Sequence, residues 1–184
     1  MDELLNIRTE GYMNVGNPVG YAEYDATPYS ILEKMVQAYP FAPEDCFVDF
    51  GCGKGRVICF AANHGCQNVI GVEYNDQIYQ ALSENVVGSR QRAHIRIVHG
   101  RAETLEIDQR LNKCFFYNPF YLKYFIKIYN NIMNFSRAKS VLLFMYDAAE
   151  EYRRFLNRQK NAVCESRIRD RDSMRELLVY RVSR

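Results

Sequence analysis

Two patterns of apolar and polar positions alternate along this chain. Short apolar or alternating runs predict strands, and stretches with apolar residues at helical spacing predict the helices between them. Strands are predicted at residues 46–50, 69–73, 94–98, 114–117, 140–146, 162–168 and 176–182. Helices are predicted from Thr27-Pro28 to Tyr39, at residues 55–64, from Asn75 or Asp76 to Val86, at residues 122–133 and at residues 148–156.

The order of these elements predicts the fold class. Strands that alternate with helices indicate an α/β fold with a doubly wound, mostly parallel sheet of seven strands. The last two strands face each other across the polar turn Asp170-Arg171-Asp172, so they predict an antiparallel C-terminal hairpin. Residues 1–23 have no clear period and are expected to form an N-terminal arm or lid. Residues 24–184 are expected to form a single domain.

A glycine-rich segment follows the first predicted strand. Asp49 lies near the end of that strand, and Gly51, Gly53 and Gly55 follow at alternate positions. The second strand ends in Glu73, whose carboxylate can accept both hydroxyls of a ribose. Glycines let the backbone turn tightly and approach a ligand closely. Together these features predict a pocket for an adenosine-containing cofactor at the carboxyl ends of two adjacent parallel strands.

The glycine spacing and Asp49 favour one cofactor. Dinucleotide folds usually space their glycines G-x-G-x-x-G, whereas this chain has G-x-G-x-G with an acidic residue before it. S-adenosylmethionine carries an ammonium group that can bind to the carboxylate of an acidic residue, so this cofactor is favoured over NAD. Here the chain resembles the class I S-adenosylmethionine-dependent methyltransferases, roughly over residues 24–147. The resemblance implies a Rossmann-like fold, S-adenosyl-L-methionine as cofactor and S-adenosyl-L-homocysteine as product.

The resemblance also assigns roles to residues around the cofactor. Asp49 and the backbone at residues 51–53 would hold the methionine end, Glu73 the ribose, and Tyr74 the adenine. The adenine would also contact the turn after the third strand, where Arg101 replaces the acidic residue usual in the family, so that contact is expected from Glu103 or from backbone. The predicted cofactor-binding residues are therefore Tyr24, Thr27, Asp49, Gly51, Cys52, Gly53, Gly55, Glu73, Tyr74, Ala102, Glu103 and Asn118.

The predicted catalytic residues Asn118, Pro119 and Phe120 follow the fourth strand. They resemble the Asn-Pro-Pro-aromatic motif of amino-group methyltransferases, with one proline missing. In that motif the asparagine and a proline carbonyl accept hydrogen bonds from the target amine, and the aromatic ring stacks on it. The alternative is a structural turn with a core phenylalanine.

The segment Tyr24-Asp25-Ala26-Thr27-Pro28 carries a narrower resemblance. It is similar to the small prokaryotic and mitochondrial protein-lysine methyltransferases, in which the segment before the first helix closes over the methionine end of the cofactor. Tyr24 and Thr27 are therefore expected at the cofactor. Thr27 is also expected to cap the helix that follows.

Charge keeps a second acceptor open. Residues 152–184 contain ten Arg and Lys against four Asp and Glu, whereas the whole chain has a net charge of +2. A basic hairpin favours an acidic acceptor such as RNA. The alternative is a solvated strand face on which basic and acidic residues alternate.

Composition bounds the remaining classes. No apolar run reaches the roughly 18 residues that a membrane span needs, and the first residues are acidic without a signal-peptide pattern. The six cysteines form no C-x-x-C pair and the three histidines have no metal spacing with them. We therefore expect a reduced, cytoplasmic protein without a metal site, whose oligomeric state the sequence leaves open.

The combined expectation is N-methylation of an amine, with a protein lysine favoured over an RNA base or a small molecule. Two other classes stay open. One is a catalytically silent cofactor-binding module, because of the departures at Arg101 and at residues 118–120. The other is a nicotinamide-dependent oxidoreductase, against which the glycine spacing and Asp49 argue.

Overall fold

A computed structural model of the chain describes residues 1–11, 24–170 and 173–184. Its centre is one seven-stranded sheet with the order β3-β2-β1-β4-β5-β7-β6. The first five strands are parallel, and β7 pairs antiparallel with both β5 and β6. The predicted fold class is therefore confirmed. The strands are β1 (Cys46–Phe50), β2 (Asn68–Glu73), β3 (Ile95–His99), β4 (Leu111–Tyr117), β5 (Ser140–Tyr146), β6 (Ala162–Arg169) and β7 (Glu176–Ser183).

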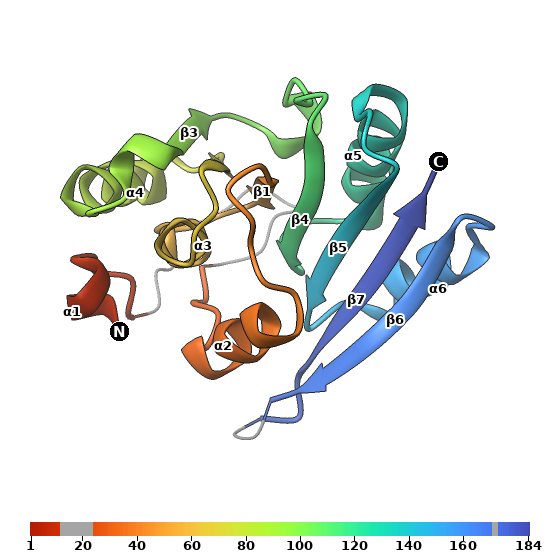
Figure 1. The fold of residues 1–184 in the computed structure, drawn as a ribbon, viewed down its shortest axis with the longest axis horizontal. Helices are drawn as coiled ribbons and strands as arrows, with labels where there is room; N and C mark the ends of the chain where they lie inside the picture. The colour runs from red at the N-terminus through yellow and green to blue at the C-terminus, as the bar shows by residue number, and fades with distance from the viewer. Residues whose placement is uncertain (12–23, 171–172) are drawn as a thin grey trace.

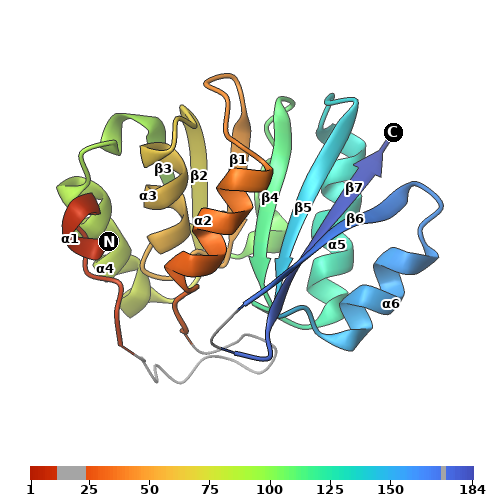
Figure 2. The same cartoon turned by 60° about the horizontal axis from the view of Figure 1, so that its bottom comes forward.

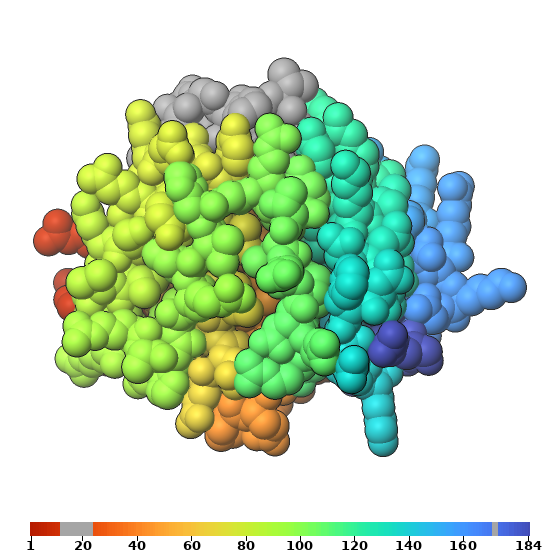
Figure 3. Space-filling model, turned by 90° about the horizontal axis from the view of Figure 1, so that it is seen from above, coloured from red at the N-terminus to blue at the C-terminus, as the bar shows by residue number. Residues whose placement is uncertain are grey.

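Helices cover both faces of the sheet (Figures 1 and 2). One face carries α1 (Asp2–Leu5), α2 (Tyr29–Ala38), α3 (Arg56–Asn63) and α4 (Asp76–Gly88). The other face carries α5 (Leu122–Phe135) and α6 (Glu150–Arg158), with the short 3₁₀ helix η2 (Ala102–Thr104) against α5. A second 3₁₀ helix, η1 (Arg92–His94), precedes β3. Figure 3 shows the same order across the surface, from α1 in red through the green residues near β3 to α5 in teal and α6 in blue.

The two cores follow from the alternation of side chains along the strands. In β1, Cys46, Val48 and Phe50 pack under α5 and α6, whereas Phe47 packs under α2 and α3. Successive side chains of a strand point to opposite faces, so a central strand covered on both faces, such as β1, becomes buried throughout. The edge strand β6 instead alternates half-buried and exposed positions.

Two helix starts differ in how they are capped. Asn75 caps α4 as predicted, because its side chain accepts hydrogen bonds from the backbone N–H groups of Gln77 at 3.0 Å and Ile78 at 3.1 Å. The predicted cap by Thr27 was wrong by one position. Pro28 is the N-cap of α2, and no side-chain hydrogen bond caps that helix. Thr27 is buried instead, and its carbonyl accepts a hydrogen bond from Arg56.

The first residues of the predicted arm are docked on the fold. Asn85 of α4 pairs with the backbone of Arg8 in both directions, at 2.8 and 3.1 Å. Arg56 of α3 donates to the hydroxyl of Thr9 at 2.7 Å and lies 3.7 Å from the carboxylate of Asp2. Residues 1–11 are thus tied to α3 and α4, whereas residues 12–23 of the predicted arm lie outside the described residues.

A buried ion pair ties together the amino ends of the central strands. Lys113 of β4 donates to the carboxylate of Asp45 at 2.6 Å and to the carbonyl of Pro40 at 2.7 Å. Asn112 donates to the other carboxylate oxygen of Asp45, also at 2.6 Å. Burial raises the pKa of Asp45, but hydrogen bonds from the Ala42 backbone, Lys113 and Asn112 outweigh it and lower this pKa below its usual value.

Among the described residues, no helix combines the length and the apolar character that crossing a membrane requires.

Candidate functional site

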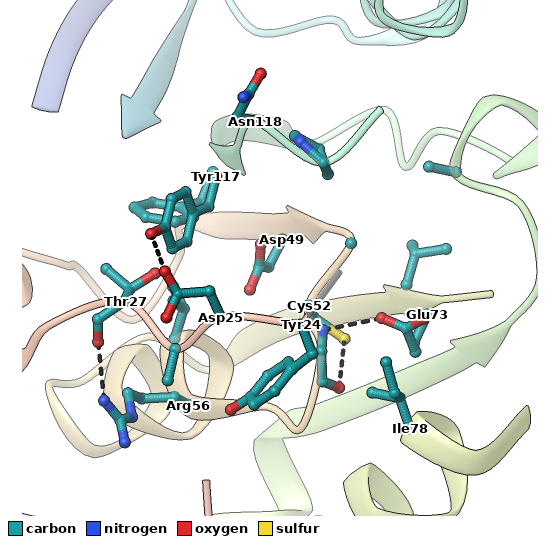
Figure 4. Close-up of a pocket in the computed structure, with 18 of the residues that line it drawn as sticks. Tyr24, Asp25, Thr27, Asp49, Cys52, Arg56, Glu73, Ile78, Tyr117 and Asn118 are labelled. Carbon is teal, nitrogen blue, oxygen red and sulfur yellow. Dashed lines mark hydrogen bonds between the residues drawn. The ribbon is translucent and has the colours of Figure 1, made fainter. Parts of the chain in front are cut away.

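A cavity opens at the carboxyl ends of the parallel strands (Figure 4). The residues that line the cavity follow the strand order. They extend from the turn after β3, past the ends of β2 and β1, to the ends of β4 and β5. Residues 24–27, called the Tyr24 segment below, line another part of the cavity. Twelve predicted site residues line the cavity: Tyr24, Thr27, Asp49, Gly51, Cys52, Gly53, Glu73, Tyr74, Ala102, Asn118, Pro119 and Phe120.

Asp49 contributes a buried carboxylate to the floor of this cavity. The residue is 3% exposed, and no group in the described part of the chain donates a hydrogen bond to it. Burial, and then the charge of Glu73, raise the pKa of Asp49 well above its usual value. A buried carboxylate without a partner is costly, so a structure that keeps one at the wall of a cavity is prepared for a cationic ligand.

Glu73 is held in place by backbone donors. Its Oε1 atom accepts from the N–H groups of Tyr74 at 2.9 Å and Asn75 at 2.8 Å, and its Oε2 atom accepts from Gly53 at 3.0 Å. Burial raises the pKa of Glu73, and these three hydrogen bonds partly offset that rise. Oε2 has the greater capacity left, so a ligand hydroxyl would bind at that oxygen.

Glycine is required at two positions of the loop after β1. Gly51 has φ +84°, and a Cβ there would lie 2.8 Å from Cβ of Pro119. Gly53 has φ +56°, and a Cβ there would lie 2.4 Å from the ring of Tyr24. Both have the left-handed conformation that glycine adopts without strain. The loop therefore packs tightly against β4's terminal turn on one side and the Tyr24 segment on the other.

Two predicted cofactor contacts do not line the cavity. Gly55 is the N-cap residue of α3, where a Cβ would collide with Leu82 of α4, so its position is set by helix packing. Glu103 lies in η2, and its carbonyl accepts a hydrogen bond from Asn131 of α5 at 3.3 Å. Gly100 and Ala102 form the wall at this end instead.

The Tyr24 segment is fixed above the glycine loop. Tyr24 is buried, its hydroxyl donates to the carbonyl of Thr9 at 2.5 Å, and Lys54 lies 4.8 Å from its ring centre. Arg56 donates to the carbonyl of Thr27 at 3.2 Å. These contacts hold the segment against the first residues and α3, whereas its closure over a bound cofactor stays a prediction.

The three residues after β4 lie in different surroundings. Asn118 is exposed with φ +40°, and its side chain points away from Asp49 in Figure 4. Phe120 is buried edge-to-face against Phe116, and its carbonyl accepts a hydrogen bond from the hydroxyl of Tyr152. Amine recognition by Asn118 stays a prediction that requires its side chain to turn inward.

Sequence reasoning did not identify a polar cluster at the β4–β5 end of the cavity. Arg175 lies 2.9 Å from the carboxylate of Asp25 and 3.3 Å from that of Asp147. The hydroxyl of Tyr117 donates to the carboxylate of Asp25 at 2.5 Å, and Arg175 donates to that same Tyr117 hydroxyl. Asp147 directly follows β5, so the strand-end reasoning that found Asp49 could have found it too. Arg175 carries no such signal, because its position depends on the register of the hairpin.

Known proteins resemble this chain in sequence and structure. The sequence model of the family described as "Histone methylation protein DOT1" matches residues 11–101. A protein-lysine N-methyltransferase of Saccharolobus islandicus is 27% identical over 92 residues, which cover 50% of this chain. The matched part spans 57% of that protein's length.

Solved structures resemble nearly the whole fold. The Escherichia coli protein yhhF, described as a candidate methyltransferase, superposes with a TM-score of 0.71 at 15% identity, covering 96% of this chain and 98% of its own. An RNA methyltransferase of Salinibacter ruber, solved with S-adenosyl-L-homocysteine, superposes with a TM-score of 0.63 at 15% identity, covering 86% of this chain and 93% of its own. The resemblance expected from the glycine motif is thereby confirmed. The chain shares its fold with these methyltransferase structures.

Proposed function

We propose that this chain is an S-adenosylmethionine-dependent methyltransferase that methylates an amine, with a protein lysine as the favoured acceptor. One observation carries the proposal. The cavity presents a buried carboxylate, Asp49, without a hydrogen-bond partner in the described ranges, beside the backbone-held Glu73. A cation next to a diol is the combination that these two carboxylates fit, and S-adenosylmethionine has both.

The residues present fit the cofactor along the line of the cavity. Asp49 and the backbone of Gly51, Cys52 and Gly53 would accept and orient the methionine end. Oε2 of Glu73 would accept from the ribose. Tyr74 and Ala102 would enclose the adenine, and Tyr24 and Thr27 would exclude water from above. Burial of Cys52 raises the pKa of its thiol well above the usual value, so this residue shapes the wall as a neutral group.

The transfer itself asks little acid–base chemistry of the protein. When bound, S-adenosylmethionine supplies a methyl group on a positively charged sulfur. The acceptor ammonium first loses a proton to solvent. Its neutral nitrogen then forms the new N–C bond while the S–C bond breaks, the electron pair of that bond stays on sulfur, and the product is a methylated ammonium. The chain has to align the amine with the methyl group and keep water away. An enclosed cavity wall built on rigid strands suits that task.

Two proteins or families that resemble this chain in sequence support the choice of a lysine acceptor. The matching family is described by histone methylation, and the Saccharolobus islandicus protein is a protein-lysine N-methyltransferase. An RNA acceptor is the alternative, favoured by the basic residues at 152–184 and by the Salinibacter ruber structure. We further propose that residues 24–184 act as one catalytic domain and residues 1–23 as its arm.

Calorimetric titration with S-adenosylhomocysteine tests the cofactor assignment, with NADH titrated in parallel. We expect micromolar binding of S-adenosylhomocysteine alone, and a loss of roughly 10- to 100-fold in Asp49→Asn, because a charge-assisted hydrogen bond is removed. Asp108→Asn is the matched control, since Asp108 pairs with the exposed Arg110 and does not line the cavity. Equal affinities of the two variants, or heat only with NADH, would contradict the proposal.

Transfer of radiolabelled methyl groups to separated protein and RNA fractions then tests the activity. Acid-stable label in protein that is recovered as methyl-lysine is the expected result. Label only in RNA would transfer the proposal to the alternative acceptor. Binding of S-adenosylhomocysteine without transfer to either fraction would indicate a silent cofactor-binding module.

A further inference from the structure

The far end of the cavity from Glu73 contains a cation held by several acceptors. The Arg175 guanidinium lies between the carboxylates of Asp25 and Asp147, at 2.9 and 3.3 Å, and 5.6 Å from the ring centre of Tyr117. All four residues line the same cavity as Asp49. The cluster is therefore a wall of the proposed active site.

Topology places this cluster where an acceptor would enter. Tyr117 ends β4 and Asp147 follows β5, on the side of β1 opposite Glu73. Because β7 is antiparallel, its first residues lie at the same edge of the sheet, and the backbone N–H of Asp147 donates to Glu176 at 2.9 Å. With the ribose at Glu73 and the methionine end at Asp49, the next positions along the line face the transferable methyl group.

The charges of the cluster leave an excess of acid. Burial raises the pKa of Asp25, but hydrogen bonds from Tyr117 and Arg175 outweigh it and lower this pKa, so Asp25 is charged at neutral pH. Two carboxylates then face one guanidinium. Side chains of Arg175, Asp25 and Asp147 are 41, 54 and 40% exposed, so their pairs are screened by water and exchange readily with another cation.

Asp147 has a second unusual property. It has φ +49°, one of three positive values among the described residues other than glycine, and Asn118 beside the same cavity is another. A non-glycine residue in this region is uncommon, and such strain gathers at sites that bind or react. The left-handed turn ends β5 abruptly and places the Asp147 carboxylate at the cavity instead of continuing the strand.

We propose that Asp25, Tyr117 and Asp147 form the binding site for the cationic side chain of the methyl acceptor, and that Arg175 is the resident cation which the acceptor replaces. The proposal rests on the proposed function and specifies its substrate class. The site selects a lysine side chain, since an ammonium fits two carboxylates and the face of an aromatic ring. An RNA phosphate would instead require Arg175 to stay in place as its partner.

Arg175→Gln tests this directly, with Arg181→Gln as its control. Arg181 lies in the same hairpin, is also 41% exposed and pairs with Glu165, but it does not line the cavity. Both substitutions change the net charge equally, so any difference between them reports the site. Fluorescence anisotropy would measure the affinity of each variant for a labelled oligolysine peptide and for a labelled oligouridine, with S-adenosylhomocysteine present.

We expect Arg175→Gln to bind oligolysine roughly two- to fivefold more tightly than Arg181→Gln, the range for a partly exposed charge pair. Adding Asp147→Asn should remove that gain, and oligouridine should bind both variants equally. No difference between the variants, including no measurable peptide binding by either, would overturn the proposal. Weaker oligouridine binding by Arg175→Gln alone would overturn it in favour of RNA.

Two further measurements separate the ways in which this can fail. Thermal unfolding checks that the variants fold. Calorimetry with S-adenosylhomocysteine checks cofactor binding, which Arg175→Gln should leave within about twofold of the wild type because the cluster lies beyond Asp49. If the wild type does not bind S-adenosylhomocysteine, the proposed function is refuted. If it does bind, but Arg175→Gln and Arg181→Gln have equal affinity for the peptide, only the acceptor site is refuted.

Discussion

Asp49 is the residue at which stability and ligand binding conflict most directly. Its carboxylate is buried, is affected by the negative charge of Glu73 and has no hydrogen-bond partner in the described part of the chain. In the unfolded chain it would be hydrated and charged at neutral pH. Folding therefore works against the charged form, and only a cationic ligand compensates for it.

Asp49→Asn is expected to stabilise the free protein at neutral pH. The folded-state pKa is raised, so the contribution of Asp49 to stability is present below about pH 4, its usual unfolded pKa, and is lost as pH rises through the folded value. The melting temperature should rise by about 2–4 °C at pH 7, the shift that about 1 kcal/mol produces in a chain of this size. The gain should shrink in acid, and a lower melting temperature at pH 7 would contradict this account.

The same residue predicts a pH dependence of cofactor binding. An ammonium favours the Asp49 carboxylate, so binding should release a proton wherever the free residue is protonated. The affinity for S-adenosylhomocysteine should rise with pH and then level off. Calorimetric enthalpies in phosphate and Tris buffers should differ accordingly, and the difference should vanish in Asp49→Asn. Equal enthalpies in the two buffers would show that Asp49 is already ionised.

At this scale the sequence predicted some residues and missed others for physical reasons. Asp49, Glu73 and the glycines could be found because strand ends and loop glycines leave local patterns. Asp147 had the same local signal, whereas Arg175 reaches the cavity only through the pairing of β5 with β7.

Helix α3 joins the first residues, the Tyr24 segment and the glycine loop through one side chain. Arg56 is largely buried and donates to Thr9 and to the carbonyl of Thr27. Its guanidinium also lies 4.5 Å from the ring centre of Tyr29. Arg56 thus connects the Tyr24 segment to α3, the helix that follows the glycine loop.

Arg56→Gln should loosen that connection. We expect S-adenosylhomocysteine to dissociate faster, and the free energy of unfolding to fall by about 1–3 kcal/mol because buried acceptors lose their donor. Stopped-flow dissociation and urea unfolding measure the two effects. Arg154→Gln is the control, since Arg154 forms an exposed pair with Glu150 on α6. An unchanged dissociation rate would mean that the Tyr24 segment is held by other contacts.

Element boundaries also show what local patterns miss. The fourth strand was predicted at residues 114–117 but begins at Leu111. Asn112 and Lys113 interrupt the apolar run, so periodicity excluded them. Both are accommodated in β4 because Asp45 accepts hydrogen bonds from their side chains, a partner that lies far away in sequence.

Over the whole molecule, the two edges of the sheet have different tasks. The carboxyl edge carries the cavity with its strained and unpartnered groups. The amino edge carries the Asp45–Lys113 pair, in which the carboxylate and the ammonium each have hydrogen-bond partners. The overall topology was predictable because alternating strands and helices leave few arrangements.

Lys113→Met should therefore reduce stability without changing the site. Removing one partner of a buried pair costs about 3–5 kcal/mol, so urea unfolding at pH 7 should show a large loss. Because the folded-state pKa of Asp45 is lowered, its contribution is present above about pH 4 and is lost as pH falls, so the variant should be less sensitive to acid than the wild type.

Asn112→Ala is the milder companion, expected to cost about 1–2 kcal/mol, and keeps the test possible if Lys113→Met does not fold. S-adenosylhomocysteine should bind folded Asn112→Ala with wild-type affinity. A change in that affinity would show that the two edges are coupled.

Because β7 runs in the reverse direction, the residues that line the cavity come from two separate parts of the sheet. The glycine loop, Glu73 and the turn after β3 belong to the parallel half of the sheet, whereas Arg175 belongs to the hairpin that closes it. If the proposed roles hold, substitution of Arg175 should change the acceptor site and leave Asp49 and Glu73 in place. The acceptor preference and the cofactor preference of this fold are therefore expected to respond to substitutions in different parts of the chain.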